Sequence, residues 1–157
     1  MEEILLQSLN DTLALGERLG RAAGAGGVIA LCGGLGAGKT HLTKGIVAGV
    51  GADPEGVSSP TFSLVQEYEG GRLPVFHFDF YRVASPDEVL AIGWDEYLEA
   101  GGVCVVEWAD LFPQLLPAGT QWWRLELSPQ GIRRARREEA GRAGGLCGNG
   151  ASSRPPS

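Results

Sequence analysis

The most constraining feature of this 157-residue chain is the stretch LCGGLGAGKTHLTKG, residues 31–45. Its residues Gly33, Gly38, Lys39 and Thr40 satisfy the pattern GxxxxGKT. The apolar run VIALC leads into the pattern, and a segment with helical periodicity follows it. A strand, a glycine-rich turn and a helix in that order are typical of the phosphate-binding P-loop, or Walker A motif. The stretch therefore predicts a triphosphate site.

Each part of the motif has its own predicted role. The glycines let successive backbone N–H groups turn toward the phosphates at the positive end of the helix. Lys39 would reach the β- and γ-phosphate oxygens, and the Thr40 hydroxyl would hold Mg²⁺. The alternative is a glycine-rich turn at a helix start that contains Lys-Thr by chance. The matching strand and helix on either side favour the phosphate site.

The other segments predict a P-loop NTPase-like α/β domain of three layers over residues 1–137, with a mixed, mainly parallel sheet and one antiparallel hairpin. Strands are expected at residues 3–8, 28–32, 62–69, 73–81, 103–108 and, as the last strand, 121–128. Helices are expected at residues 10–23, 40–50 and 85–101, with a short helical turn in 109–117 and a loop at 51–61. Asn10 or Asp11 would cap the first helix, and Ser85 the third, which would break at Gly93.

The C-terminal residues differ from the rest in composition and charge. Residues 1–132 hold 7 basic and 17 acidic side chains, net −10, whereas residues 133–157 hold 6 and 2, net +4. An acidic body binds nucleic acid poorly, so no DNA binding is expected. Residues 138–157 are predicted to be a disordered Gly/Arg/Ser-rich tail. The run RRARREEAGR is predicted to be a solvated or locally ordered charge cluster, with RNA or an acidic partner as the alternative.

Composition also predicts where the protein acts. No apolar run approaches the roughly 18 residues of a membrane span, and MEEILLQSLND does not resemble a secretory signal, so we expect a cytoplasmic protein. Three cysteines without a CxxC pair argue against a disulfide framework or a zinc site. Cys32 and Cys104 lie in apolar runs and are expected in the core, and Cys147 is expected to be an exposed thiol.

Two acidic residues are candidates to complete a magnesium–nucleotide site. Asp79 in HFDFY and Glu107 in VVEWAD each follow apolar strand residues. A buried carboxylate needs a cation or hydrogen bonds close by, because burial without a partner costs several kcal/mol. A structural ion pair is the alternative for either one, and their joint occurrence beside a phosphate loop favours the catalytic interpretation.

Three further side chains have two interpretations each. Thr61 in SSPTF would sense a γ-phosphate from a switch-like loop, or it would form turns with Ser58 and Ser59. His77 shares a strand face with Asp79, which permits a His-Asp catalytic pair, although a packed, hydrogen-bonded histidine is favoured. Arg82 would be a salt-bridge partner, which is favoured, or a γ-phosphate ligand.

The motifs that are missing narrow the class of protein. No NKxD guanine-reading element occurs, which disfavours a Ras-like GTPase. A small-molecule kinase needs an arginine-bearing lid and an acceptor pocket, and the segment after the glycine loop is poor in arginine. A small-molecule P-loop kinase is therefore retained only as an alternative.

The ordered set CGGLGAGKTHLTKG, VSSPTFSLVQEY, VFHFDFYRV, IGWDEYL and VVEW closely resembles the TsaE (YjeE) family of bacterial ATPases in tRNA threonylcarbamoyladenosine biosynthesis. The resemblance implies that ATP or ADP is bound by residues of the loop and of the segments after it, namely Gly33, Gly36, Ala37, Gly38, Lys39, Thr40, His41, Trp108 and Arg133. It implies that Thr40 and Glu107 hold Mg²⁺. Lys39, Asp79, Glu107 and Thr61 would be the catalytic residues, with Asp79 as the Walker-B-like carboxylate.

The resemblance also implies partners and a role. A family member is a weak ATPase alone, acts with the TsaB and TsaD proteins, and resets their complex by hydrolysing ATP, so its contact with tRNA would be indirect. The alternative is a nucleotide-gated docking module whose turnover is incidental. This chain departs from the family at Gly34, where an acidic residue is usual, and at His41, where Thr or Ser is common.

Overall fold

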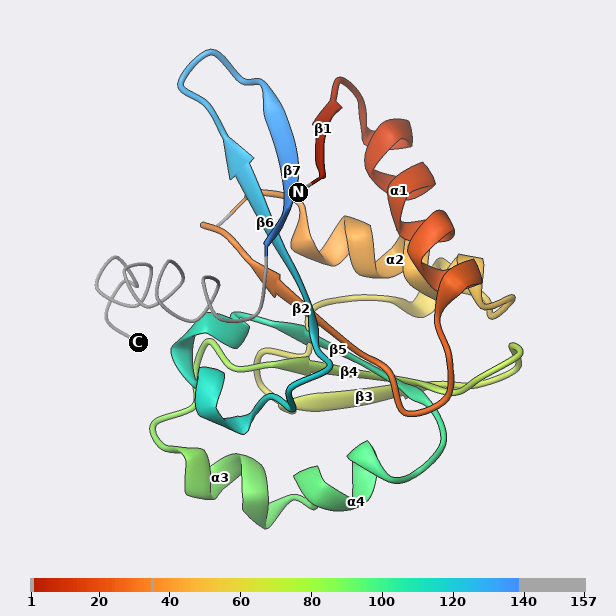
Figure 1. Ribbon diagram of the computed structural model, residues 1–157, viewed down its shortest axis with the longest axis vertical. Coiled ribbons are helices and arrows are strands. Elements are labelled where there is room, and N and C mark those ends of the chain that lie inside the picture. Colours follow the sequence, from red (N-terminus) through yellow and green to blue (C-terminus); the bar gives the residue numbers. More distant parts are fainter. Residues whose placement is uncertain (1, 35, 139–157) are drawn as a thin grey trace.

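The computed structural model describes residues 2–34 and 36–138, which form an α/β domain (Figure 1). In this part of the chain the elements are β1 (Glu3–Leu6), α1 (Leu9–Ala22), β2 (Val28–Cys32), α2 (Lys39–Gly49), η1 (Pro54–Gly56), β3 (Val65–Tyr68), β4 (Val75–Asp79), α3 (Pro86–Ala91), α4 (Trp94–Leu98), β5 (Val103–Glu107), η2 (Ala109–Leu111), η3 (Pro113–Leu115), β6 (Gln121–Leu127) and β7 (Arg133–Glu138).

The strands form one mixed sheet in the order β1-β7-β6-β2-β5-β4-β3. The four strands in its middle, β6, β2, β5 and β4, are parallel to one another. Strand β3 pairs with β4, β7 with β6, and β1 with β7, all antiparallel. Parallel neighbours end at the same edge of the sheet, so the residues that follow β2, β4 and β5 are brought together there.

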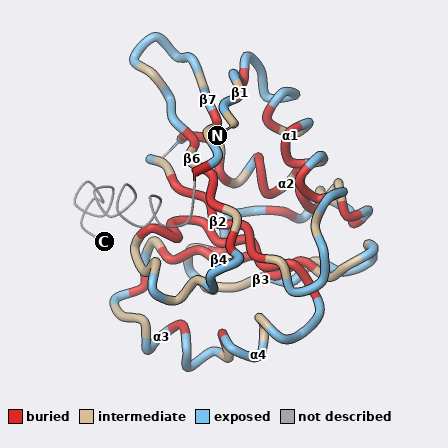
Figure 2. Tube along the Cα trace, in the orientation of Figure 1, coloured by how far each residue is buried: buried red, intermediate tan, exposed pale blue. Residues whose placement is uncertain are grey.

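Helices cover both faces of the sheet, as the alternation along its strands requires. In β2, Ile29 and Leu31 join the apolar cluster that includes α1 and α2. Val28 and Ala30 face the other way, into the cluster that includes α3 and α4. Strands β2, β4 and β5 are buried at every residue, whereas the tip of the β6–β7 hairpin is exposed (Figure 2). The predicted three-layer α/β arrangement is therefore present.

The prediction of a single hairpin and of a last strand at 121–128 is wrong, because β7 follows β6 in a second antiparallel hairpin. Residues 133–138 read RRARRE, and among them Ala135 and Glu138 are buried. Ion pairs hold the strand on both sides: Arg134 to Glu3 of β1, at 3.9 Å, and Arg136 to Glu126 of β6, at 3.4 Å. The predicted charge cluster is thus part of the sheet as far as Glu138, and residues 139–157, including Cys147, lie outside the described residues.

Ser8 caps helix α1, which begins at Leu9, in place of the predicted caps Asn10 or Asp11. The Ser8 hydroxyl accepts a hydrogen bond from the backbone N–H of Asp11 at 3.2 Å. The Asp11 carboxylate in turn accepts from the backbone N–H of Gln7 at 2.9 Å. This reciprocal arrangement resembles a capping box. It explains why Asp11 lies in the first turn of α1 instead of at the capping position before the helix.

Helices α1 and α2 touch through their backbones. Gly16 and Gly20 of α1 face Gly45 and Gly49 of α2, so that a methyl group added at Gly16 would lie 2.7 Å from the Gly45 Cα. A methyl group at Gly49 would lie 2.9 Å from the Gly20 Cα. Glycine at all four positions is therefore what allows the helix that carries Lys39 and Thr40 to lie directly against α1.

The remaining helices agree with the sequence. Ser85 precedes α3, Pro86 occupies its first position, and Gly93, with φ 98°, ends this segment and begins α4. Cys32 and Cys104 are buried in the core, as expected. Across residues 2–34 and 36–138, none of the helices has the length and the apolar content that crossing a membrane requires.

Candidate functional site

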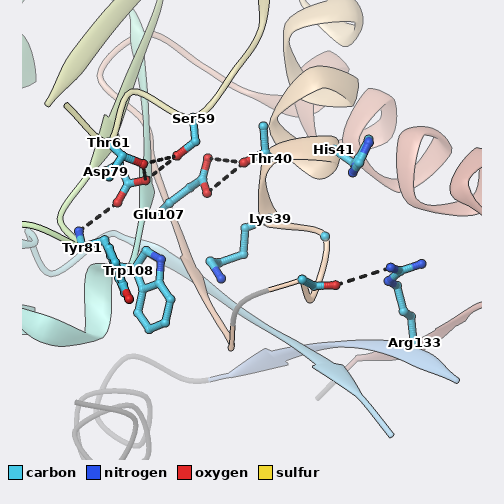
Figure 3. A pocket seen from close by; sticks show the side chains of 12 residues that line it. Lys39, Thr40, His41, Ser59, Thr61, Asp79, Tyr81, Glu107, Trp108 and Arg133 are labelled. Atoms are coloured by element: carbon cyan, nitrogen blue, oxygen red, sulfur yellow. Dashed lines mark hydrogen bonds between the residues drawn. The ribbon is translucent and has the colours of Figure 1, made fainter. Parts of the chain in front are cut away.

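The polar residues singled out in the sequence gather at the edge where β2, β4 and β5 end (Figure 3). Asp79 is the last residue of β4 and Glu107 the last of β5, and the two are direct partners in the sheet register. The cavity between them, the glycine loop and β7 has a volume of about 440 Å³. Its lining is Gly36, Gly38, Lys39, Thr40, His41, Ser59, Thr61, Asp79, Tyr81, Glu107, Trp108 and Arg133. Gly33 and Ala37 are not among these residues, and Ala37 is buried.

The loop before α2 wraps around the Lys39 side chain. Gly38 has φ 105° and stands at the N-terminus of α2, a left-handed conformation that glycine adopts without strain. The Lys39 ammonium donates to the carbonyl oxygens of Gly33 and Gly34, at 2.8 Å each. It also lies 4.4 Å from the centre of the Trp108 ring. The Lys39 ammonium is therefore held beside the N-terminus of α2, where both the ammonium and the helix dipole attract an anion.

Burial and nearby acids act on Lys39 in opposite directions. Its side chain is 5% exposed, and loss of hydration lowers the pKa of the ammonium. The negative charges of Glu107, Asp79 and Asp110 partly offset this effect. Asp110 is itself buried in η2, and desolvation raises the pKa of its carboxyl. An incoming polyanion would favour the charged form of Lys39 in the same way as these acids do.

Glu107 is tied to the first turn of α2. Both of its carboxylate oxygens lie 3.1 Å from the Thr40 hydroxyl, and Oε2 lies 2.6 Å from His77 Nε2. Glu107 and His77 are both buried. The sequence paired His77 with Asp79 as one interpretation, but the structure pairs it with Glu107 on the neighbouring strand. The preferred interpretation, a packed and hydrogen-bonded histidine, is confirmed.

Asp79 is tied to the loop that precedes β3. Its Oδ2 accepts hydrogen bonds from the hydroxyls of Ser59 and of Thr61, the latter at 3.0 Å. Its Oδ1 accepts from the backbone N–H of Tyr81 at 2.8 Å. Thr61 therefore lies in the cavity beside a buried carboxylate. Ser59, which the sequence analysis considered only as a turn residue, shares this position.

Two aromatic residues and one arginine complete the walls of the cavity. Trp108 has φ 58°, unusual for so bulky a side chain, and its ring lies 4.8 Å from that of Tyr81. Arg133, the first residue of β7, approaches the carbonyl oxygen of Gly36, 3.4 Å from its Nη2. His41 lies on α2, is exposed, and lines the cavity. The sequence analysis did not identify Tyr81, although it follows the carboxylate strand directly.

Arg82 does not take either of its predicted roles. Its guanidinium lies 4.6 Å from the centre of the Phe62 ring, and Phe62 is 87% exposed. Arg82 does not line the cavity, and in the described part of the chain no ion pair with it is formed. The exposed phenylalanine of the SSPTF loop supplies a cation–π contact in place of a salt bridge.

The donor set fits a magnesium–nucleotide complex better than a metal held by protein alone. A hydroxyl and a carboxylate meet at Thr40 and Glu107, and both supply the oxygen ligands that Mg²⁺ prefers. Across the described residues, His, Cys, Asp and Glu form no group of three that could hold a metal ion. Mg²⁺ takes most of its ligands from water and phosphate, so a site with few protein ligands next to the glycine loop suits it.

Comparisons with known proteins give a consistent family. The model of the family described as "Threonylcarbamoyl adenosine biosynthesis protein TsaE" matches residues 6–138. A protein of Bacillus subtilis named "tRNA threonylcarbamoyladenosine biosynthesis protein TsaE" is 42% identical over 119 residues, 74% of this chain and 73% of its own length. A Treponema pallidum protein of the same name is 39% identical over 127 residues, 81% of this chain and 93% of its own.

A solved structure resembles the fold as well. The crystal structure of YdiB from Bacillus subtilus superposes with a TM-score of 0.72 at 30% identity. The match covers 97% of this chain and 94% of that one.

Proposed function

Because the chain belongs to the TsaE family of tRNA threonylcarbamoyladenosine biosynthesis proteins, we propose that its cavity is the MgATP site of a P-loop ATPase. The observation that carries the proposal is the meeting of three groups at one end of α2. These are the Lys39 ammonium inside the glycine loop, the Thr40 hydroxyl and the Glu107 carboxylate. A cation, a hydroxyl and a carboxylate beside a helix N-terminus are what a triphosphate and its Mg²⁺ require.

The binding roles follow from position. Backbone N–H groups from Gly36 to His41 would surround the phosphates, and Lys39 would contact the β- and γ-phosphate oxygens. Arg133 would contact the nucleotide from β7, His41 from the first turn of α2, and Trp108 from the end of β5. Thr40 and Glu107 would hold Mg²⁺, which when bound neutralises charge on the phosphates. ADP would occupy the same site after hydrolysis.

The catalytic roles divide between the two carboxylates. Glu107 is held by Thr40 and His77, which suits a metal ligand whose position must not vary. Asp79 lines the same cavity and binds Ser59, Thr61 and the Tyr81 N–H. We assign Asp79 to orient the attacking water, and Thr61 to sense the γ-phosphate from a switch-like loop. Lys39 would stabilise charge on the transferring phosphoryl group.

The proposed place of action is the cytoplasmic complex with the TsaB and TsaD proteins. There, ATP hydrolysis would reset the complex, and this chain would contact tRNA only indirectly. The test compares ATP hydrolysis by the purified chain alone and with both proteins added. Slow hydrolysis that rises when both are present supports the proposal, and hydrolysis unchanged by them contradicts the partner assignment.

A second candidate, a nucleotide-gated docking module, is favoured by the contacts of Ser59 and Thr61 with Asp79. These contacts tie an exposed loop to the floor of the cavity, so a bound nucleotide could rearrange the loop without being hydrolysed. The two candidates differ in whether turnover is needed for tRNA modification.

Replacing Glu107 by glutamine separates them. Glutamine keeps the size of the side chain but removes the charge of the proposed Mg²⁺ ligand, so we expect MgATP affinity reduced about 100-fold and the rate of hydrolysis at saturating MgATP also reduced about 100-fold. Affinity is measured by calorimetry and hydrolysis by phosphate release. Loss of tRNA modification by this variant supports an ATPase cycle, and full modification supports gating. Glu55→Gln, on the exposed η1 segment, is the matched control and should match wild type in every assay.

A further inference from the structure

The buried His77 contacts no part of the proposed nucleotide site except Glu107, and its hydrogen bond to that carboxylate is shorter than those of Thr40. It is 0% exposed, and its Nε2 lies 2.6 Å from Glu107 Oε2. An ionised carboxylate can only accept hydrogen bonds, so the contact needs a proton on Nε2. A glutamate side chain has three rotatable bonds, and the contacts of the Thr40 hydroxyl with both oxygens are long, at 3.1 Å. The imidazole adds a shorter bond to Oε2.

A second contact connects the same ring with the loop of residues 57–64. When the neutral ring carries its proton on Nε2, Nδ1 is an acceptor, and the Tyr68 hydroxyl lies 3.4 Å from it. That hydroxyl also lies 3.0 Å from Gln66 Oε1 and 3.5 Å from the carbonyl oxygen of Ser58. A hydroxyl has a single proton and can donate to only one of these acceptors at a time.

We propose that His77 is a positioning residue that sets the orientation of the Glu107 carboxylate toward Thr40 and, through Tyr68, makes this orientation depend on the loop of residues 57–64. If the loop moves the Ser58 carbonyl, the Tyr68 hydroxyl gains or loses an acceptor, and its bond to His77 changes with it. Thr61, at the other end of this loop segment, binds Asp79. The loop thus contacts both carboxylates, Asp79 directly and Glu107 through two side chains.

The inference rests on the proposed function for its consequence, which is the affinity for Mg²⁺ in the presence of ATP. Groups that hydrogen-bond to metal-ligating side chains typically contribute 10- to 100-fold to metal affinity or activity. His77→Leu removes the donor and keeps the site apolar and filled. His77→Gln returns an N–H near the position of Nε2. Tyr68→Phe removes only the hydroxyl.

The first measurement needs no nucleotide. NMR of the ¹⁵N-labelled imidazole should show the His77 proton on Nε2, and His77→Leu should shift the Thr40 amide signal. Tyr68→Phe should shift the His77 Nδ1 signal, whereas Tyr97→Phe, another tyrosine whose hydroxyl contacts a glutamate, should not. A proton on Nδ1 in place of Nε2, or an unshifted Thr40 amide, overturns the inference even if the chain binds ATP.

The second measurement compares ATP affinity with Mg²⁺ and with a chelator. His77→Leu is expected to lose 10- to 100-fold of the affinity seen with Mg²⁺ and to change the affinity without it by less than 3-fold. His77→Gln should recover most of the loss, which a merely structural role would not produce. An equal loss in both conditions overturns the inference. If wild type does not bind ATP at all, the proposed function fails, and the NMR result still decides the role of His77.

Thermal unfolding of each variant without nucleotide shows whether it folds. If His77→Leu does not fold, Tyr68→Phe decides the same question, because its substitution lies on a partly exposed ring. We expect it to weaken the Mg²⁺-dependent affinity by about 3-fold, a smaller effect since the Tyr68–His77 contact is long. No change in that affinity, together with an unshifted His77 Nδ1 signal, would contradict the coupling to the loop.

Discussion

Replacing Lys39 by alanine is expected to lower ATP affinity at least about 10-fold and the rate of hydrolysis about 100- to 1,000-fold. Two losses combine in this variant. The phosphates lose the buried Lys39 ammonium. The carbonyl oxygens of Gly33 and Gly34 lose the donor of the hydrogen bonds that they accept in the native protein. Affinity is measured by calorimetry with MgATP, and hydrolysis by phosphate release in the presence of the TsaB and TsaD proteins.

Lys44→Ala provides the matched control for Lys39→Ala. Lys44 lies on the same helix, is partly exposed, and is not among the residues that line the cavity. We expect its removal to leave both measurements unchanged, which would show that the effect at Lys39 is not one of net charge. Full ATP affinity and full stimulated hydrolysis in Lys39→Ala would refute the proposed site.

The second large effect is expected in stability, from Gly45→Ala. Alanine normally stabilises a helix relative to glycine by about 1 kcal/mol. Here the added methyl group would clash with the carbonyl oxygen of Leu13 and lie 2.9 Å from the Gly16 Cα. Backbone atoms cannot move aside as a flexible side chain can, so we expect a net loss of about 3 kcal/mol in the free energy of unfolding. The melting temperature should fall by roughly 10 °C.

Gly24→Ala is the matched control, because nothing lies within 4 Å of a methyl group built on Gly24. This change should be neutral or slightly stabilising, since it restricts the unfolded chain only. Calorimetric or circular-dichroism melts of both variants check the pair. Equal melting temperatures for Gly45→Ala and wild type would show that the two helices can separate without loss of stability.

The central part of the site was predictable because strong patterns lie next to each other in the sequence. VIALC and VCVV are uninterrupted apolar runs that indicate buried parallel strands, and parallel strands place Glu107 and the glycine loop at one edge. Asp79 follows from the same argument for the run that ends in it. These patterns do not predict which side chains the carboxylates of Asp79 and Glu107 contact.

The contact between His77 and Glu107 illustrates that limit. Spacing along one strand pairs His77 with Asp79, two residues away, whereas its partner is 30 residues away on the adjacent strand. A contact of this kind depends on sheet order and register, which neither segment contains by itself. The same holds for the hydroxyls of Ser59 and Thr61, whose acceptor belongs to β4.

Strand β7 was missed for a different reason. Its residues are charged apart from Ala135, so the alternation of apolar and polar residues that indicates a strand is nearly absent. Its stability comes mainly from pairing with β1 and β6 on both sides, since the ion pairs to Glu3 and Glu126 are largely exposed and contribute little. The sequence places Arg133 at the start of a charged run, with a nucleotide contact implied only by the family resemblance, and the structure makes it the first residue of a strand beside the cavity.

The glycines of α1 and α2 were visible in the sequence but were not interpreted. Gly16 and Gly20 are four residues apart, as are Gly45 and Gly49, which places each pair on one side of its helix. That spacing is a signal for close helix contact, because only small residues let two backbones approach. A search for paired small residues in adjacent predicted helices would have found it.

The contact between these helices also decides which parts of the molecule are able to respond to a nucleotide. Sliding α2 by a single residue, 1.5 Å along its axis, would press side chains of one helix into the backbone of the other. Helix α2 is therefore held in a fixed position against α1. We therefore expect a nucleotide-dependent motion outside the α1–α2 contact, in the loop of residues 57–64 that leads into β3 and whose Thr61 contacts Asp79.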